Sequence, residues 1–310
     1  MSVSRESAFF EYLKERERVR RRKAADLVAL ENFEDPQGPP WTDDPVLQQY
    51  KFTNVRRHHD KTSMKLRELF YEKHFYEDKA SVLMNCALFR YFGTWEFAEA
   101  VGWQDYENFD FEGIKEKARQ RLIRRERVFT GAYVITNQGI SAPKQEVVVD
   151  VFLKGLHSWT PTILAEAKAS QSWKSVARVM RSIPGFGGTG FMTKEVLIDT
   201  TYTGFWKQVQ ITEEDGRFSW PEDWWEWTPV GPGALRGAAR VLGDDLAVPL
   251  KEKKAFGVIK NLQFWQESYW PIAEYGQLSP TDIQFGLCEF DKYERVRLGQ
   301  GKPRSRYKGY

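Results

Sequence analysis

The chain has 310 residues and a formal net charge of +3, from 46 Lys and Arg against 43 Asp and Glu. Because these charges nearly balance, a nucleic-acid surface must be a local basic patch rather than a general positive coat. Two cysteines are too few for a disulfide scaffold or a cysteine-based zinc site, and the absence of a signal core and of any run of about 18 apolar residues predicts a cytoplasmic protein without a membrane partner.

The first part of the chain has mainly helical patterns. Residues 5–31 form a charged amphipathic pattern, whose basic run at 18–23 is either a solvated face, which we favour, or an arm that contacts phosphates. The connector at 34–44 contains several prolines and cannot be a continuous helix. Further helices are predicted at 62–76, 78–91, 94–101 and 111–127.

A dense polar segment lies between the connector and these helices. It contains Asn54, Arg56, Arg57 and Asp60. An arginine pair suits phosphate because guanidinium groups donate two parallel hydrogen bonds, and Asp60 could orient one arginine or act as a base. The alternative is a helix N-terminal network with solvent-facing charges, and on chemistry alone it ranks slightly ahead.

For two apolar segments the sequence pattern does not determine the secondary structure. Residues 129–135 fit a strand, a buried loop or a short helix. Residues 146–156 favour a strand by their valines, yet short apolar runs are poorly resolved by pattern alone.

The segment at 183–190, Ile-Pro-Gly-Phe-Gly-Gly-Thr-Gly, separates helical patterns at 173–180 and 191–198. This order predicts a helix–hairpin–helix, in which glycines allow positive φ and the amides that begin the second helix favour an anion, most often a nucleic-acid phosphate. The letters also match Gly-x-Gly-x-x-Gly, but a helix rather than a strand comes first, which disfavours a dinucleotide fold. The predicted DNA contacts are Gly185, Gly187, Gly188, Gly190 and Lys194.

An aromatic loop at 212–229 leads to a second glycine turn at 230–237. The loop tryptophans, among them Trp227, either anchor a small core, which is the commoner role, or stack on a base. The turn is predicted to open a helix at 238–242. Two such turns in one helical protein favour phosphate binding over simple capping, so Gly231, Gly233 and Arg236 are further predicted DNA contacts.

The C-terminal part contains predicted helices at 250–274 and 280–294. In the second of these, Asp291 and Lys292 share a face with Cys288. Glu289 lies between apolar neighbours, and a semi-buried carboxylate suits proton transfer, although a structural ion pair has the same sequence pattern and is the safer interpretation. Residues 299–310 form a basic tail that we expect to be mobile when free and to order on a phosphate backbone.

Several catalytic signatures are absent from the sequence. Its only Gly-Lys pair, at 301–302, is followed by proline and lacks the first glycine of a Walker A loop. The four histidines have no metal-ligand spacing, and no zinc protease or zinc deaminase motif occurs. We therefore expect neither a metal ion nor another cofactor.

Six different short motifs follow one another along most of the chain. They lie at 38–45, at 52–57 with Asp60, at 129–133, at 183–187, at 230–234 with Gly237, and at 287–293. This set resembles the phage thymine-hypermodification family of amino acid:DNA transferases, also known as α-glutamyl/putrescinyl-thymine pyrophosphorylases, and the helical domain of 5-hydroxymethyluracil DNA kinases. The resemblance implies a mainly α, helix–hairpin–helix DNA-glycosylase-like fold with few short strands. The expected parts are a charged helix at 1–36, a helical DNA-binding and catalytic domain of one or two lobes at 37–298, and the tail at 299–310.

The resemblance also implies a reaction. A separate kinase phosphorylates 5-hydroxymethyluracil in phage DNA, and the transferase then displaces that phosphate from the 5-methylene carbon with a free amino acid, glycine being the one expected. The modified thymine protects the DNA from restriction in the host cytoplasm. The hairpin lacks the lysine and the later aspartate of the related glycosylases, so glycosidic cleavage is not expected.

For this reaction the resemblance implies cations on the leaving phosphate, a base for the amino group and an aromatic pocket for the extruded base. The catalytic candidates are Asn54, Arg56, Arg57, Asp60, Asp199, Glu289, Asp291 and Lys292, and the pocket candidates are Tyr133 and Trp227. The alternatives are a helical partner that presents DNA to the kinase, a non-catalytic helix–hairpin–helix DNA-binding protein and, last, a glycosylase.

Overall fold

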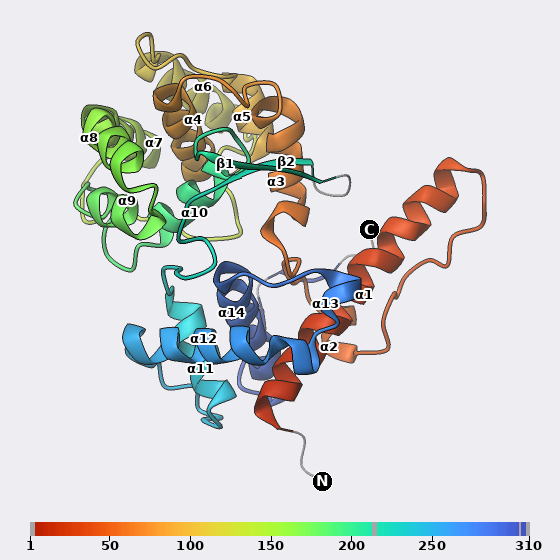
Figure 1. The fold of residues 1–310 in the computed structure, drawn as a ribbon. Coiled ribbons are helices and arrows are strands. Elements are labelled where there is room, and N and C mark those ends of the chain that lie inside the picture. Colours follow the sequence, from red (N-terminus) through yellow and green to blue (C-terminus); the bar gives the residue numbers. More distant parts are fainter. Residues whose placement is uncertain (1–3, 213–215, 304, 308–310) are drawn as a thin grey trace. The chain divides into compact units, whose positions relative to one another are not determined.

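The computed structural model describes residues 4–212, 216–303 and 305–307, and within them the protein is mainly α-helical (Figure 1). The α-helices are α1 Arg5–Glu31, α2 Pro45–Gln49, α3 Lys61–Leu66, α4 Lys79–Phe92, α5 Trp95–Val101, α6 Phe111–Ile123, α7 Lys144–Glu146, α8 Lys154–Ser170, α9 Trp173–Met180, α10 Phe191–Thr200, α11 Pro232–Val241, α12 Glu252–Tyr269, α13 Ile272–Tyr275 and α14 Pro280–Arg297. A 3₁₀ turn, η1, covers Arg57–His59, and two π-helical segments cover Arg67–Tyr71 (η2) and Val147–Leu153 (η3). Strands β1 Gln208–Thr212 and β2 Gly216–Trp220 pair antiparallel, with Gln208 opposite Trp220.

The prediction of a mainly α fold with few short strands is confirmed. No helix of the described residues is long and apolar enough to cross a membrane.

The chain divides into two compact units. Unit 1 combines Met1–Asp60 with Val230–Tyr310, and unit 2 is Lys61–Pro229. The parts expected at 1–36 and 299–310 do not coincide with this division, because both fall within unit 1. Of the basic tail, residues 304 and 308–310 lie outside the described residues.

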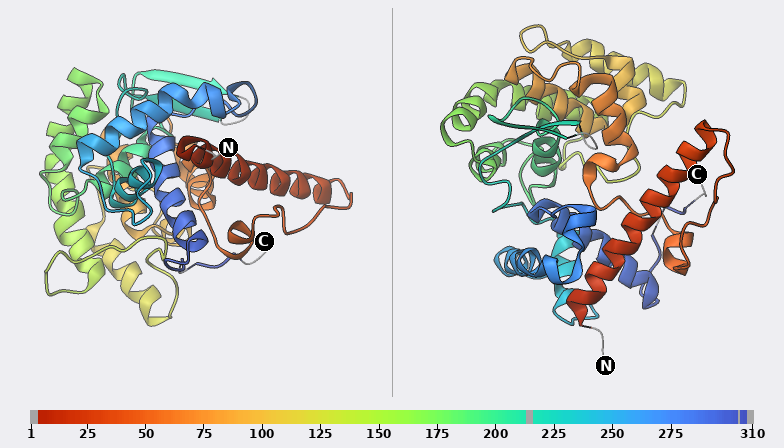
Figure 2. Two further views of the ribbon diagram at one scale, coloured as in Figure 1. Left: turned by 90° about the horizontal axis from the view of Figure 1, so that it is seen from below. Right: turned by 45° about the vertical axis from the view of Figure 1, so that its right-hand side comes forward.

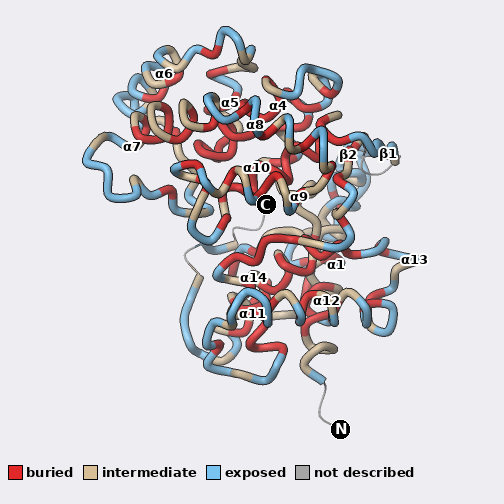
Figure 3. The backbone as a smooth tube through the Cα atoms, turned by 60° about the vertical axis from the view of Figure 1, so that its left-hand side comes forward, coloured by how far each residue is buried: buried red, intermediate tan, exposed pale blue. Residues whose placement is uncertain are grey.

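Unit 1 is built on the helices α11, α12 and α14, against which α1 packs. Figure 2 shows α1 as one long continuous helix. Its first half is amphipathic, and Phe9, Phe10 and Leu13 are buried in the core, each burial contributing about 1.5–3 kcal/mol to folding. The Phe9 ring lies 5.6 Å from that of Phe290 in an edge-on contact. The second half has little to pack on, so Leu27, Val28 and Leu30 are exposed. Figure 3 colours the backbone by the burial of each residue.

The connector after α1 is fastened by the carboxylate of Asp26. It accepts hydrogen bonds from the Trp41 indole N–H and from the backbone N–H groups of Gln37 at 2.8 Å and Gly38 at 2.9 Å. The hydrogen bond from Trp41 is the main reason that the pKa of Asp26 lies below its ordinary value. Asp26 therefore helps to hold the turn-rich segment against α1, together with Arg22, which donates to the carbonyl of Trp41 at 2.6 Å.

We expect this fastening to be lost at low pH. A folded-state pKa below the unfolded one means that the ionised Asp26 stabilises the fold above its unfolded pKa, and that this contribution disappears as the pH falls through the folded pKa. The chemical shift of the Trp41 indole N–H should therefore move in this acid range. In Asp26→Asn it should be displaced already at neutral pH and stay constant on acidification. An indole resonance that moves equally in both proteins would contradict the assignment.

Unit 2 is organised around α4, which is almost entirely buried and packs against α8 and α10. Residues 129–135 form an irregular loop, and the valine-rich segment at 146–156 is helical throughout, first as α7 and η3 and then as α8. Its three valines, Val147–Val149, are all buried, and a segment surrounded by core shows no alternation from which a helix could be told from a strand. The β1–β2 hairpin was not predicted.

Candidate functional site

The residues proposed from the sequence are divided between the two units. Unit 1 holds Asn54, Arg56, Arg57, Asp60, Gly231, Gly233, Arg236, Glu289, Asp291 and Lys292, and unit 2 holds Tyr133, Gly185, Gly187, Gly188, Gly190, Lys194, Asp199 and Trp227. Each group is therefore described within its own unit.

In unit 1 the polar segment before α3 lies against α14. The carboxylate oxygen Oε2 of Glu289 accepts the backbone N–H of Thr53 at 2.9 Å and the ammonium of Lys292 at 2.5 Å. The ammonium of Lys292 also donates to the carbonyl of Lys51 at 3.1 Å and lies 4.5 Å above the ring centre of Phe52. Two segments that are 236 residues apart in sequence thus share one cluster of charges.

Glu289 is the carboxylate of this cluster that has one oxygen available for a further hydrogen bond. Both of its hydrogen bonds end on Oε2, and among the described residues Oε1 accepts none. The side chain is 14% exposed, so it is shielded but not sealed. A carboxylate with one fixed and one unengaged oxygen is oriented for proton transfer.

Asp60, in contrast, is engaged at both oxygens. Oδ2 accepts from the Arg57 guanidinium at 2.6 Å and Oδ1 accepts the backbone N–H of Asn54 at 2.9 Å. The Asn54 amide closes the same turn by donating to the carbonyl of His59 at 2.6 Å. The sequence slightly favoured a helix N-terminal network with solvent-facing charges. The network does precede α3, but its charges are mostly shielded, since the side chains of Arg57 and Asp60 are 17% and 14% exposed.

Arg56 is the less committed of the two adjacent arginines. It is half-buried, and within the described part of the chain its one hydrogen bond goes to the carbonyl of Gln277 at 3.2 Å. Its remaining N–H groups make the guanidinium the better of the pair for holding an oxyanion, because Arg57 is already paired with Asp60.

Asp291 forms a buried ion cluster on the other side of α14. It is fully buried and accepts from Nε of Arg236 at 2.8 Å and from Nε of Arg240 at 2.8 Å. Arg240 was not predicted, although its spacing of four residues from Arg236 places both on one face of α11. A carboxylate enclosed by arginines is a structural ion pair, so Asp291 is a weaker candidate base than Glu289.

The second glycine turn predicted at 230–237 is wrong. Helix α11 begins already at Pro232, and its cap residue Gly231 has a φ of −80° that any residue can adopt. A Cβ at Gly233 would overlap Sγ of Cys288, and one at Gly237 would lie 2.6 Å from the carbonyl carbon of Leu287. These glycines let α11 and α14 pack closely instead of forming a second phosphate-binding turn.

The hairpin of unit 2 has the predicted form, with α9 and α10 joined by a turn. Gly185, Gly188 and Gly190 have φ values of +89°, +60° and +70°. Gly185 is also packed so tightly that a Cβ would lie 2.5 Å from the Tyr91 hydroxyl. Gly188, with open space beside it, is the position of the turn where a ligand could approach the backbone.

The remaining candidates of unit 2 are more buried than expected. Lys194 is 3% exposed and lies 3.3 Å from Glu195, so its ammonium is buried, and its contact with DNA stays a prediction. Asp199 is fully buried and accepts from Arg90 at 2.5 Å and from Tyr71 at 2.8 Å, as a structural ion pair does.

The two aromatic candidates of unit 2 differ in how firmly they are held. The Tyr133 hydroxyl donates to the carbonyl of Arg90, and the ring lies 5.2 Å from that of Phe191. Trp227 is half-buried in its loop, in which Trp224 is buried against Trp173 at a ring distance of 5.1 Å. The loop therefore has an aromatic anchor, and both candidates remain proposals for contact with a base.

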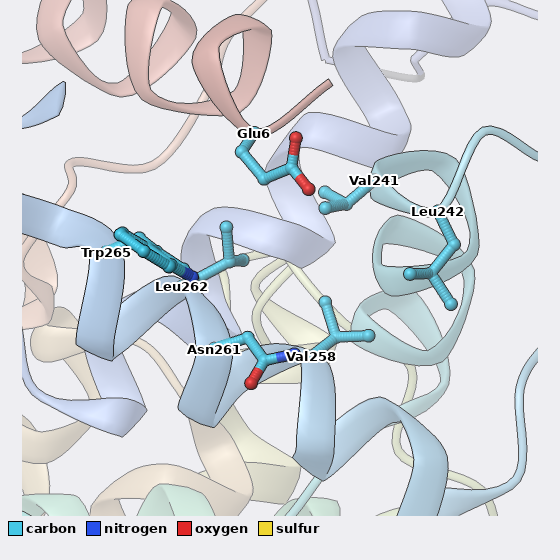
Figure 4. Close-up of a pocket in the computed structure, with 7 residues that line it drawn as sticks. All are labelled: Glu6, Val241, Leu242, Val258, Asn261, Leu262 and Trp265. Atoms are coloured by element: carbon cyan, nitrogen blue, oxygen red, sulfur yellow. The ribbon is translucent and has the colours of Figure 1, made fainter. Parts of the chain in front are cut away.

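Unit 1 also has a concave spot near the start of α1 (Figure 4). It is lined by Glu6, Val241, Leu242, Val258, Asn261, Leu262 and Trp265. Apolar side chains dominate, Glu6 is its one ionisable group, and none of the predicted site residues lines it. Its composition does not suit a reaction that moves protons and phosphate.

Comparison with known proteins gives one consistent result. The chain matches the model of the family described as 5-hmdU DNA kinase, helical domain, over residues 4–302. It is 30% identical over 221 residues to a 5-hmdU DNA kinase of Bacillus phage SP10, a match that covers 66% of this chain and 32% of the relative. The chain thus spans about a third of the length of this curated relative. No solved structure matches it.

Proposed function

Because this chain belongs to the family of 5-hmdU DNA kinase helical domains, we propose that it acts in the modification of thymine in DNA, as an amino acid:DNA transferase. Its substrates are 5-phosphomethyl-deoxyuridine in DNA and a free amino acid, with glycine as the first to test. A 5-hydroxymethyluracil DNA kinase supplies the phosphorylated base. The product is a thymine whose 5-methylene carbon carries the amino acid through its nitrogen.

The reaction is a substitution at the 5-methylene carbon. The amino nitrogen forms a C–N bond as the C–O bond to phosphate breaks, phosphate leaves with the electron pair of that bond, and the nitrogen loses one proton. In unit 1, Oε1 of Glu289 is the proposed proton acceptor and the Arg56 guanidinium the proposed partner of the leaving phosphate. The observation that carries this proposal is that the Glu289 carboxylate is held at one oxygen, by the backbone N–H of Thr53, while its other oxygen is available. Thr53 precedes Arg56 by three residues.

DNA binding is assigned in this proposal to the hairpin of unit 2. The open backbone at Gly188 suits close approach of a phosphate, and Arg181 reaches the same turn by donating to the carbonyl of Gly188 at 2.8 Å.

A second candidate function is that of a helical partner that presents DNA to a kinase without chemistry of its own. It is favoured by the description of the matched family, which is a kinase helical domain, and by the share of the longer relative that the chain spans. The two functions differ in whether the chain alone changes the DNA.

One assay separates these functions. The full chain is incubated with single- or double-stranded DNA carrying 5-phosphomethyl-deoxyuridine and with each amino acid in turn, and the nucleosides are identified by mass spectrometry. A mass gain that requires one amino acid and the phosphate supports the transferase. Binding without a product for any amino acid rejects it in favour of the presenting partner. Abasic sites would indicate a glycosylase. DNA with unphosphorylated 5-hydroxymethyl-deoxyuridine is the control.

Arg56→Ala is expected to reduce turnover about 10- to 100-fold, because it removes charge-assisted hydrogen bonds to the leaving phosphate. The Kd for DNA should change less than about twofold, as measured by fluorescence anisotropy under the same salt. Lys253→Ala, at an exposed position of α12, is the matched control and should leave both quantities unchanged. Equal losses of turnover and of DNA affinity in Arg56→Ala would instead identify a contact to the DNA backbone.

A further inference from the structure

Unit 1 contains buried polar atoms that have no hydrogen-bond partner among the described residues. Three of them are the hydroxyl oxygens of Tyr12 and Tyr307 and the Nη1 nitrogen of Arg16, from α1 and from the C-terminal segment. Tyr12 is only 5% exposed. Buried polar groups in folded proteins are nearly always paired, so these unmet groups call for an explanation such as an absent ligand.

These groups are close enough to act on one another. Tyr12 and Arg16 are four residues apart on α1 and therefore share a face. Burial raises the pKa of Tyr12 well above its ordinary value, the Glu289 carboxylate raises it further, and the Arg16 guanidinium lowers it. Burial likewise raises the pKa of Tyr307, and Arg16 again opposes the rise. Arg16 is thus the common neighbour of both tyrosines, and Glu289 is part of the same group.

The guanidinium of Arg16 is held in place by the polar segment of the site. Nε donates to the carbonyl of Thr53 at 3.0 Å, and Nη2 donates to Oδ1 of Asn54 at 2.5 Å and to the carbonyl of Phe52 at 3.3 Å. Only Nη1 is left over. A guanidinium fixed on two sides with one unused nitrogen, beside an unused hydroxyl, has the donor set that binds an oxyanion.

A short C-terminal segment lies beside Arg16. The carbonyl of Ser305 accepts from the N–H of Lys51 at 3.1 Å, and the N–H of Tyr307 donates to the carbonyl of Gln49 at 3.0 Å. Apart from these two bonds, the ring of Tyr307 lies 6.2 Å from that of Trp41 in an edge-on contact. Among the described residues this segment makes few bonds to the rest of unit 1, and a segment with few bonds opens at low free-energy cost.

We propose that Arg16 and Tyr12 bind the α-carboxylate of the amino-acid substrate, and that the segment 305–307 covers this site until the substrate enters. This inference rests on the proposed function, because it assigns one substrate of that reaction. Oxygen atoms of the carboxylate accept from Nη1 of Arg16 and from the Tyr12 hydroxyl. Glu289, the proposed proton acceptor, belongs to the same cluster and serves the amino group.

Tyr12→Phe tests the site because a binding role and a structural role predict different results. Removing an unpaired buried hydroxyl should leave Tm unchanged or raise it by about 2 °C. The Kd for glycine, measured by titration calorimetry without DNA, should rise about tenfold. Tyr269→Phe, a tyrosine of α12 outside the cluster, is the matched control and should change neither quantity. An unchanged Kd for glycine in Tyr12→Phe would overturn the proposal.

Tyr307→Ala tests the cover. Loss of the tyrosine ring should lower the Kd for glycine in the full chain, because less contact has to be broken before the ligand enters. Inorganic phosphate is the second probe, since it presents the same oxyanion chemistry. Phosphate that binds more tightly than glycine and loses affinity in Tyr12→Phe would overturn the amino-acid assignment and identify a site for the leaving group.

These measurements are independent of turnover. Product formation by the unaltered chain, combined with an unchanged KM for the amino acid in Tyr12→Phe, would reject the carboxylate site and leave the proposed function standing. Glycine binding that weakens in Tyr12→Phe, without any product from the unaltered chain, would reject the transferase and retain the site.

Discussion

Glu289→Gln is expected to lower kcat of amino-acid transfer by about 10²- to 10⁴-fold, the range that a positioned proton acceptor contributes. Glutamine has nearly the same shape and can still accept the N–H of Thr53, so the polar segment should remain in place. The proton of the attacking amino group, however, would have no carboxylate to receive it. The rate is measured under single turnover, with the nucleoside product quantified by mass spectrometry.

Asp60→Asn is the control for the assignment of Glu289 as the proton acceptor. Both oxygens of Asp60 are engaged in the local turn, so its loss should affect stability more than the chemical step. We expect a lower Tm and a much smaller loss of kcat than in Glu289→Gln. If Asp60→Asn abolished turnover while Glu289→Gln kept it, the assignment of the base would be reversed.

Gly237→Ala is expected to destabilise unit 1 by about 3 kcal/mol, at the upper end of the cost of overpacking. The added Cβ would lie 2.6 Å from the carbonyl carbon of Leu287 and 3.0 Å from its Cα, both of which are backbone atoms. Relief therefore requires α11 and α14 to move apart, and no side chain can rotate to make room. Urea denaturation followed by far-UV circular dichroism gives the change in the free energy of unfolding.

Two other glycines of unit 1 provide graded controls. At Gly233 the overlapping atom is Sγ of Cys288, a side-chain end that can rotate, so Gly233→Ala should cost about 1 kcal/mol. Gly257 lies within α12 with nothing near its Cβ direction, so Gly257→Ala should stabilise the protein by about 0.5–1 kcal/mol through helix propensity. A uniform effect of the three substitutions would show that close packing is not the role of Gly237.

The helices were largely predictable from the sequence because their apolar residues recur with helical spacing. The predicted ranges 5–31 and 173–180 agree with α1 and α9 at both ends. The pattern failed at the three consecutive buried valines Val147–Val149, since a run that is apolar at every position shows no periodicity. It failed also for Gly233 and Gly237, because sequence does not distinguish a glycine needed for positive φ from one needed for close packing.

The candidate site was predictable in its outline but not in its detail. The segments around Thr53 and Glu289 both carry predicted site residues, and they lie together. Which carboxylate is enclosed by cations depends on contacts between distant segments, so Asp291 and Asp199 are indistinguishable from Glu289 by sequence. Arg16 was not predictable because, in a helix rich in arginine, a partly buried arginine has the same sequence pattern as its solvated neighbours.

The division of unit 1 into two separate stretches of chain has a consequence for how the protein is made. The ribosome synthesises Met1–Asp60 first, yet the helices on which α1 packs follow only after Val230. Phe9, Phe10 and Leu13 therefore leave the ribosomal exit tunnel before their packing partners have been synthesised. Unit 2, Lys61–Pro229, is continuous in sequence and can fold earlier. The charged residues that flank this apolar face on α1 favour its solubility until α11, α12 and α14 have been synthesised.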